Sequence, residues 1–421
     1  MAVGIGGGGF MGIAFEVLPA PVQSALATAA TGGTILAGTY RYIVTAINAN
    51  GQTGPSNEQT ITTTGSTSTV TVSWPAVPGA TGYKLYKTAA GGAALSELLY
   101  KTVGVVTTDI DTTPGTPVGA LPISNTATTP NTYAAPTKFF RFRSETLGYK
   151  QATQWRRTIG LSVDNQGAIP GNVHTEGDIS MEAMHDVVPY FHCVSRATVV
   201  KTGVGPYIYT CTPNTAATAA KTMSITIVRN GVVFGYTGSV VSGFNYTIDN
   251  GAVVVNWTIR GSDEASQTLP TPTFVDTPVF GAGQYEFQLP TPTVVFDTSA
   301  FTFTVDDAAD PQYRFKNTGR GAQFMKFGQR TVSLSLTRDF ETRTDYDAFK
   351  ALTGQSFQVL CAAAGSSIML TAPSSIKDTY DLGLSGQGDL ITAQIAYQLT
   401  YDTATARAYQ VAITTTENFV P

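Results

Sequence analysis

The sequence has few charged side chains and no long apolar run. Charged residues make up 13% of the 421 residues and the formal net charge is −4, so the composition indicates no basic surface for reading nucleic acid. No run of 18 apolar residues occurs, so we expect no membrane-spanning helix and no membrane insertion. The N-terminal residues lack a basic region followed by a compact apolar segment, and we predict no signal peptide.

Cysteine and histidine are also scarce, with three of each. The cysteines are scattered and odd in number, which argues against a disulfide scaffold. The side chains that invite a zinc hypothesis are His174, His185, His192 and Cys193. Their spacing matches no tight ligand pair, and they straddle a predicted strand and a predicted helix, so we expect no metal site.

The sequence shows no catalytic constellation. It contains neither a nucleophile elbow nor a phosphate-cradling glycine loop. The tightest carboxylate cluster is Asp306, Asp307 and Asp310, and we interpret it as a solvated turn. We therefore predict that the protein is not an enzyme, with no catalytic residue and no cofactor.

Glycine, threonine, serine and alanine, together with valine and aromatic residues, dominate the composition, as is typical of β-rich proteins. Residues 237–261 give the clearest local signal. An Asp-Asn-Gly turn at 249–251 is flanked by two arms in which apolar and polar residues alternate. This pattern predicts a β-hairpin with one buried face and one wet face, preceded by a strand at 224–229 that enters a second turn at Asn230-Gly231.

Two further segments, 330–340 and 391–401, alternate in the same way. In all four long strands one face is aliphatic or aromatic, and the other carries mostly Ser, Thr, Asn and Gln instead of Lys and Glu. Such a face suits a surface that must be wetted without sticking, although a plain sandwich with a Thr-rich exterior would look similar. Short helices are predicted at 186–193, with Asp186 as cap, and at 345–352, opened by Thr344 and closed by Gly354.

Residues 19–129 form a segment of different character, bounded by Pro- and Thr-rich flanks that are typical of linkers. The motifs G-T-Y-R-Y-I-V-T-A-I-N-A-N-G-Q-T-G-P-S (38–56) and V-T-V-S-W-P-A-V-P-G-A-T-G-Y-K-L-Y-K (70–87) resemble the last hairpin and the early strands of fibronectin type III domains. Their order is reversed, so the segment resembles a permuted version. Periodicity alone predicts a small antiparallel sandwich.

Three other segments have open interpretations. The Gly-rich start with isolated apolar residues is either a disordered tail or an arm that orders against a neighbouring surface. The run F-F-R-F-R at 139–143 is either a nucleic-acid strip or, as we favour, an amphipathic strand. Residues 266–305 contain L-P-T-P-T twice and are interpreted as long loops or edge segments.

Taken in order, several motifs resemble tail tube proteins of long-tailed bacteriophages. They are the Gly-rich start ending in I-A-F-E, the block P-T-K-F-F-R-F-R-S-E-T-L-G-Y, the run G-D-I-S-M-E, the hairpin with its preceding strand, and the closing alternating strands. They cover 1–18 and roughly 131 to the C-terminus. The predicted domains are therefore an N-terminal arm (1–18), an inserted fibronectin type III/Ig-like β-sandwich (19–129) and a tail tube domain (130–421).

The resemblance implies an all-β fold with one or two short helices, in which a β-sandwich or barrel contributes two hairpins to a shared ring barrel. It also implies a structural virion protein that self-assembles into hexameric rings, stacked as a conduit for DNA delivery. The expected partners are further copies of the chain, other phage tail proteins and viral DNA passing non-specifically. The expected location is the virion, with the host cytoplasm before assembly, and the insert is expected outside the tube, in weak contact with host-surface glycans. The alternative is a cell-surface or virion adhesin that binds glycans.

The candidate site consists of the polar residues that alternate with the apolar residues of these four strands and therefore point to the opposite face. The side chains predicted to face the lumen are Asn245, Thr247, Asp249, Asn256, Thr258, Ser333, Ser335, Thr337, Gln394, Gln398 and Thr400. The side chains predicted to dock the arm on an adjacent subunit are Phe10, Ile13 and Phe15.

Overall fold

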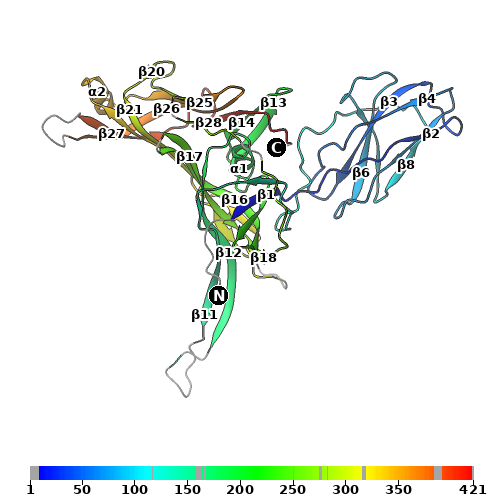
Figure 1. Cartoon of the computed structure of the whole chain (residues 1–421), viewed down its shortest axis with the longest axis horizontal. Helices are drawn as coiled ribbons and strands as arrows, with labels where there is room; N and C mark the ends of the chain where they lie inside the picture. Colours follow the sequence, from blue (N-terminus) through cyan, green and yellow to red (C-terminus); the bar gives the residue numbers. More distant parts are fainter. Residues whose placement is uncertain are drawn as a thin grey trace. The chain divides into compact units, whose positions relative to one another are not determined.

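The computed structural model describes residues 9–115, 117–156, 164, 167–249, 251–274, 277–281, 283–314, 319–383 and 391–419. The chain divides into two compact units. Unit 1 comprises Met1–Phe15 and Asn131–Phe419, and unit 2 comprises Glu16–Pro130. The predicted all-β class is confirmed, because nearly all regular structure is antiparallel strand (Figure 1).

The antiparallel strands described for unit 1 join into a closed barrel in which several strands are paired over only part of their length, and β22–β23 forms a small accessory hairpin. The strands of unit 1 are β1 (Phe10–Phe15), β9 (Lys138–Phe140), β10 (Ser144–Glu145), β11 (Gly148–Trp155), β12 (Ala168–Glu182), β13 (Ala197–Thr202), β14 (Tyr207–Pro213), β15 (Met223–Arg229), β16 (Val232–Asp249), β17 (Ala252–Gly261), β18 (Asp263–Ser266), β19 (Tyr285–Gln288), β20 (Val294–Val295), β21 (Thr298–Asp306), β22 (Asp310–Gln312), β23 (Phe324–Lys326), β24 (Thr331–Asp339), β25 (Gln355–Ala363), β26 (Ser366–Gly383), β27 (Thr392–Leu399) and β28 (Gln410–Thr415).

Two strands of 18 residues each, β16 and β26, hold the barrel together. The first half of β16 pairs with β15 and β18, and its second half pairs with β17 and β21. Likewise β26 pairs first with β25 and β28 and then with β27. Each long strand therefore passes from one part of the barrel wall to another.

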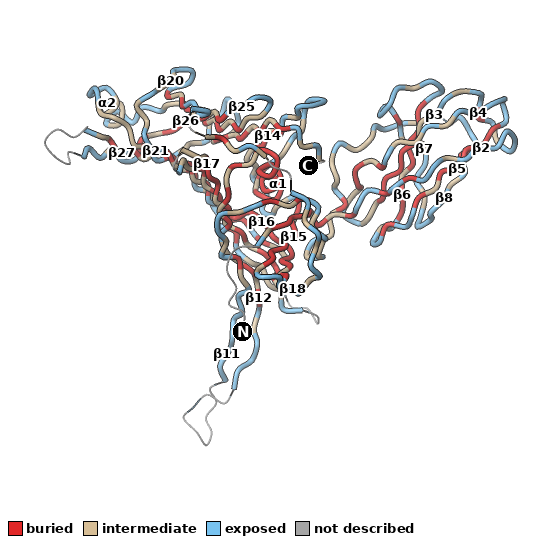
Figure 2. Tube along the Cα trace, in the orientation of Figure 1, coloured by how far each residue is buried: buried red, intermediate tan, exposed pale blue. Residues whose placement is uncertain are grey.

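The predicted hairpin forms with the register that its alternation requires. Phe244 lies opposite Trp257, and Tyr246 lies opposite Val255. The turn before it is also as expected: Asn230 and Gly231 both have positive φ, 51° and 78°, which Asn and Gly adopt at low cost. Buried side chains concentrate in the body of unit 1, whereas the hairpin β11–β12 projects from it and is largely exposed (Figure 2).

Unit 2 is a sandwich of two antiparallel sheets, ordered β2–β5–β8 and β4–β3–β6–β7. Its strands are β2 (Ala27–Ala29), β3 (Gly38–Ile47), β4 (Gln59–Thr63), β5 (Thr69–Ser73), β6 (Gly82–Lys87), β7 (Leu98–Val103) and β8 (Thr108–Asp111). Trp74 packs against Tyr83 in its core, with ring centroids 5.1 Å apart. The two ends of the unit lie side by side, because Thr129 N–H donates to the Glu16 carbonyl at 2.7 Å.

The part of the chain that the structure describes contains two short helices, α1 (Val188–Cys193) and α2 (Thr344–Lys350), but not with the predicted caps. Asp186 does not cap α1; its carboxylate pairs with Lys138 at 2.7 Å. Thr344 lies inside α2, whose N-cap is Arg343, and the positive φ after α2 belongs to Leu352 instead of Gly354. Among the described residues, no helix is long and apolar enough to cross a membrane.

Two further expectations are corrected. Residues 266–305 are not only loops and edges, because β21 is a central strand of the barrel wall, paired on both sides. The Asp306–Asp310 cluster is not uniformly solvated. Asp307 is only 2% exposed, and its carboxylate accepts a hydrogen bond from Arg330 at 2.6 Å.

Candidate functional site

Seven strands of unit 1 lie side by side and form one wall, in the spatial order β12–β17–β16–β21–β24–β27–β26. All the pairings are antiparallel, so side chains directly opposite one another across the wall share a face. One row runs through Ser180, Asn256, Asn245, Thr304, Ser333 and Gln398. The next row runs through Glu182, Val254, Thr247, Thr302, Ser335, Ala396 and Thr379.

We call this surface the polar face. Its side chains are mostly polar, and the apolar exceptions are Val254, Ala300, Ile376 and Ala396. The polar side chains are Asp178, Ser180, Glu182, Asn245, Thr247, Asn256, Thr258, Thr302, Thr304, Asp306, Ser333, Ser335, Thr337, Thr379, Asp381, Gln394 and Gln398, all half-buried or exposed.

Hydrogen bonds between strands hold these side chains across the face. Asn256 Nδ2 donates to Asn245 Oδ1 at 2.8 Å, and the Thr258 hydroxyl donates to Asp178 Oδ1 at 2.8 Å. The Thr247 hydroxyl donates to the Phe301 carbonyl at 3.2 Å. Polar side chains of neighbouring strands are thus hydrogen-bonded to one another or to the backbone while still exposed to solvent.

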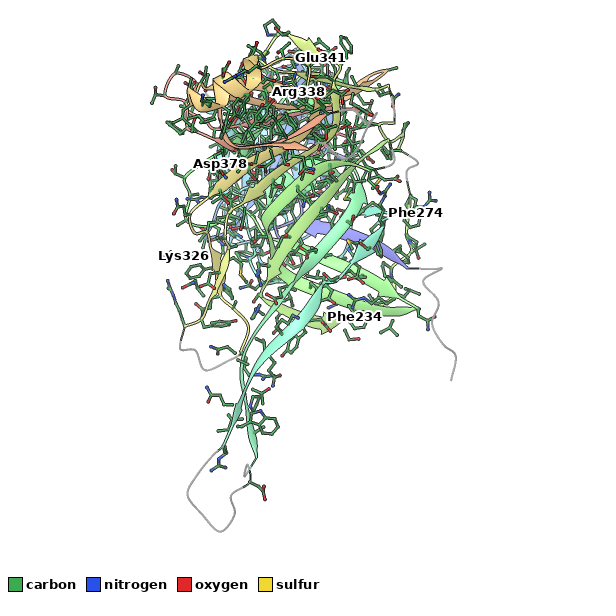
Figure 3. All side chains as sticks on the ribbon, turned by 90° about the vertical axis from the view of Figure 1, so that its left-hand side faces the viewer. Phe234, Phe274, Lys326, Arg338, Glu341 and Asp378 are labelled. Carbon is green, nitrogen blue, oxygen red and sulfur yellow. The ribbon has the colours of Figure 1, made fainter. Side chains whose placement is uncertain are left out.

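The charge on the polar face is neutral to acidic. Asp178, Glu182, Asp306 and Asp381 supply the carboxylates. Arg260 continues the face along β17, and its guanidinium is paired with the Glu176 carboxylate. Arg338 has the opposite parity on β24 and lies beside α2, bound to Asp297 at 2.7 Å and to Asp345 at 2.6 Å (Figure 3).

The opposite face of the wall is apolar and closed. Trp257 is fully buried, and its ring stacks on Phe191 of α1 with centroids 4.9 Å apart. His192 of the same helix bonds the Tyr246 hydroxyl at 3.0 Å. Burial lowers the pKa of His192 to about 3, so the imidazole is neutral in this core. The helix therefore covers the apolar face of the wall, while the polar face is exposed to solvent.

The wall brings together the predicted lumen-facing side chains of β16, β17, β24 and β27. Two of the predicted residues lie at its margins. Asp249 is at the hairpin turn, where its carboxylate pairs with Arg143 at 2.5 Å, and Thr400 follows the end of β27 and bonds the Ser374 hydroxyl at 2.8 Å. Sequence reasoning missed the contributions of β12, β21 and β26. The alternation F-T-F-T-V-D of 301–306 was a usable signal for β21.

The predicted inter-subunit arm is corrected. Residues 10–15 form β1 inside unit 1, paired with β15 and β9 of the same chain. Ile13 is fully buried in its own core, so it is not available to a neighbour. Phe10 packs on Phe139 and Phe274, and Phe15 stacks on Tyr190. The earlier part of the proposed arm, residues 4–8, lies outside the described residues.

At each end of the wall, the last strand has a hydrogen-bonded partner on one side only, as far as the described residues show. We call these two strand edges the free edges. At one end, residues 376–383 of β26 pair with β27 on one side only. At the other end, β10 and β11 pair only with β12. Leu382, on the apolar side of the β26 edge, is 48% exposed. Open edges of this kind are templates for pairing with another chain.

Each of the three histidines has a different hydrogen-bond partner. His174 bonds Tyr313 at 2.9 Å, His185 bonds Thr415 at 3.0 Å, and His192 bonds Tyr246. Within the described ranges, no group of His, Cys, Asp and Glu side chains is arranged to hold a metal ion. The Phe139–Arg143 segment is structural: Lys138, the first residue of β9, is only 7% exposed and Arg143 pairs with Asp249.

Comparison with known proteins gives one finding of similarity. Residues 93–399 match the model of the family described as phage tail tube protein. The match starts within unit 2, covers most of unit 1 and ends at the last residue of β27. A search of curated proteins finds none that matches the chain. Because the family model spans more than half of the chain, and the resemblance seen in the sequence agrees with it, the chain belongs to the phage tail tube family and is a structural protein of the virion tail.

Proposed function

We propose that the polar face lines the lumen of a tube through which viral DNA passes, and that the subunits form hexameric rings stacked along the tube. The observation that carries this proposal is the seven-strand polar face, which is hydrated and neutral to acidic. A lysine- or arginine-rich lining would neutralise phosphates, release counterions and hold the DNA. A neutral or acidic lining leaves the duplex free to move.

The size of the wall argues for several copies. Barrel diameter grows with strand number, and barrels of roughly 16 to 22 strands already enclose wide channels. One chain offers seven strands on this face, with an apolar core sealed behind them. Several copies side by side are therefore needed to surround a hydrated duplex.

The free edges supply the ring contact. The β26 edge of one subunit pairs with the β10–β11 edge of the next, which continues the wall from chain to chain. This is a heterologous, head-to-tail contact, and such contacts generate closed rings when the rotation between subunits closes. Ring closure also removes both edges, which would otherwise invite aggregation.

The projecting hairpin supplies a further contact between copies. Along β11 and the first part of β12, Tyr149, Trp155 and Ile169 are 38%, 59% and 48% exposed. A two-stranded ribbon without a covering partner is marginally stable. We assign its partner as another copy of the chain in the assembled tail.

The lumen assignment is tested by electron microscopy and DNA ejection. Thr247→Lys with Ser335→Lys should still form tubes, because both side chains are partly or fully exposed, but phage carrying them should eject DNA more slowly. The matched control is Thr353→Lys, on an exposed loop outside the polar face. Normal ejection by the double variant would contradict the lumen assignment. Purified protein that stays monomeric under all assembly conditions would contradict the tube itself and favour the adhesin alternative.

The ring contact is tested separately at the β26 edge. Leu382→Asp places a charge on the apolar side of the edge and should stop ring formation while the monomer stays folded. Asp381→Asn, one residue away on the polar face, is the control and should assemble normally. Equal assembly of the two variants would remove this edge from the interface.

Unit 2 is proposed to be dispensable for assembly. It has its own core, and its ends meet within the unit, where Leu18 N–H donates to the Ala127 carbonyl at 2.8 Å. Replacing residues 20–129 by a short Gly/Ser linker should therefore preserve ring and tube formation. A deletion variant that folds but never polymerises, seen by light scattering and microscopy, would show that unit 2 is part of the assembly interface.

A further inference from the structure

A lysine and an aspartate are buried together between the two sheets of unit 2. Lys87 ends β6 in one sheet, and Asp111 ends β8 in the other. Lys87 Nζ lies 2.8 Å from Asp111 Oδ2, and each side chain is only 2% exposed. Taking two charges out of water is costly, and their mutual attraction offsets that cost only with good geometry and further hydrogen bonds. The two groups therefore form a close contact that is shielded from solvent inside unit 2.

Aromatic side chains enclose the pair. The Tyr100 ring centroid is 4.7 Å from Lys87 Nζ, and the Tyr100 and Tyr42 rings meet edge to face at 6.1 Å. The Tyr42 hydroxyl donates to the same Asp111 Oδ2 at 2.8 Å. Lys87 Nζ also donates to the Thr113 carbonyl at 2.6 Å, which fixes the direction of the nitrogen. The nucleophile and the carboxyl group are therefore held in contact in a site that excludes water.

We propose that Lys87 and Asp111 form an intramolecular amide bond that covalently joins the two sheets of unit 2. The ammonium first passes a proton to the carboxylate, giving a neutral amine and a carboxylic acid. The Nζ lone pair then attacks Cγ of Asp111, and the tetrahedral intermediate loses its hydroxyl group as water. One N–C bond forms and one C–O bond breaks, the nitrogen keeps one proton, and the reaction needs neither oxidant nor reductant.

Tyr42 has the geometry to assist both steps. Its hydroxyl stabilises negative charge on Oδ2 during the attack and can relay the amine proton to the leaving hydroxyl. Burial and the neighbouring Asp111 raise the pKa of the Tyr42 phenol, so it keeps its proton and remains a donor. Tyr42 is accordingly assigned as the general acid of the bond-forming reaction.

A second pair in the same unit provides an internal control. Lys101 Nζ lies 2.6 Å from Asp109 Oδ1, so its contact is just as close. The Lys101 side chain is 45% exposed, and water stabilises its ammonium. Because close contact is common to both pairs and burial is not, only Lys87–Asp111 should react.

The test is intact-mass spectrometry of the full purified chain after incubation at neutral pH, followed by peptide mapping. The expected mass is lower than the calculated mass by one water molecule, with a branched peptide linking Lys87 to Asp111 and none linking Lys101 to Asp109. A folded chain of full calculated mass after prolonged incubation would overturn the proposal and leave an ion pair only. A water loss mapped elsewhere would overturn it as well.

Two variants keep the test decisive. Tyr42→Phe retains the ring and should slow bond formation about 100-fold, the usual cost of losing one such donor. Asp111→Asn should still react but release ammonia, so that its linked form has the same mass as the linked wild-type chain. If Tyr42→Phe reacts at the wild-type rate, the assigned role of Tyr42 is wrong. If folded Asp111→Asn and folded wild type both stay unlinked, the bond itself is excluded.

Discussion

The carboxyl group of Glu97 should make unit 2 less stable as pH rises through neutrality. Glu97 is only 1% exposed, and no N–H group of another residue donates a hydrogen bond to its carboxyl oxygens. Its neighbour is the Glu58 carboxylate, which pairs with Arg41 and accepts the Leu95 N–H at 2.8 Å. Two carboxyl groups in contact need a proton between them, and burial together with Glu58 raises the pKa of Glu97 to about 7.

The direction of this pH dependence follows from the linkage between proton binding and folding. The pKa of Glu97 is higher in the folded state than in the unfolded chain, so folding takes up a proton and the stabilisation is fully present at low pH. It is lost as pH rises from the ordinary glutamate pKa of 4.5 through about 7. A shift of this size corresponds to about 3 kcal/mol between pH 4.5 and pH 8. For a unit of this length that is a fall of roughly 10 °C in melting temperature.

Calorimetry of the full chain between pH 5 and pH 8 should resolve this fall in the transition of unit 2. Glu97→Gln supplies an amide N–H to Glu58 at every pH, so it should flatten the profile and raise the melting temperature mainly at the alkaline end. Glu58 has the opposite effect: its pKa is lowered, so its own contribution to stability is lost only as pH falls below the ordinary glutamate pKa of 4.5. A wild-type transition that is independent of pH, or a Glu97→Gln variant with the wild-type slope, would refute the shared proton.

Three further predictions concern unit 1. Asp307→Ala leaves Arg330 without its buried partner and should destabilise unit 1 by about 3 kcal/mol in urea unfolding, whereas Asp306→Ala at an exposed position loses only the hydrogen bond from Ala308 N–H and should cost about 1 kcal/mol. Phe419→Ala removes a ring stacked on Tyr190 at 4.0 Å and should cost about 1 kcal/mol or more by the same assay; an unchanged midpoint would show that the C-terminal segment does not contribute to folding. Trp155→Ser should leave the melting temperature unchanged but reduce tube yield in micrographs, and normal tubes would exclude this side chain from the contact between copies.

The sequence predicted individual strands well, because a period of two is a local property of each strand. The register of Phe244 with Trp257 needed only the alternation and the Gly251 turn. The neighbours of each strand were not predictable in the same way. β21 separates β16 from β24, and this order depends on contacts across the whole unit. The L-P-T-P-T repeats preceding β21 drew the interpretation towards loops, although its own alternation was legible.

The N-terminal strand shows why one physical signal can be read in two ways. A strand buried on both faces has no alternation and reads as an apolar run, and F-M-G-I-A-F follows that rule. The Gly-rich residues before it resemble a flexible terminus, which favoured an arm over a core strand. The contact that makes this segment a core strand is a tertiary contact at Gly12. A Cβ on Gly12 would lie 2.6 Å from Pro136 Cβ and 2.9 Å from the Phe139 ring. Only glycine therefore allows the chain that follows unit 2 to pack so closely on β1. Because β1 precedes unit 2 and its partner β9 follows it, closing this barrel requires the ends of unit 2 to meet, and the Glu16–Thr129 hydrogen bond is where they do.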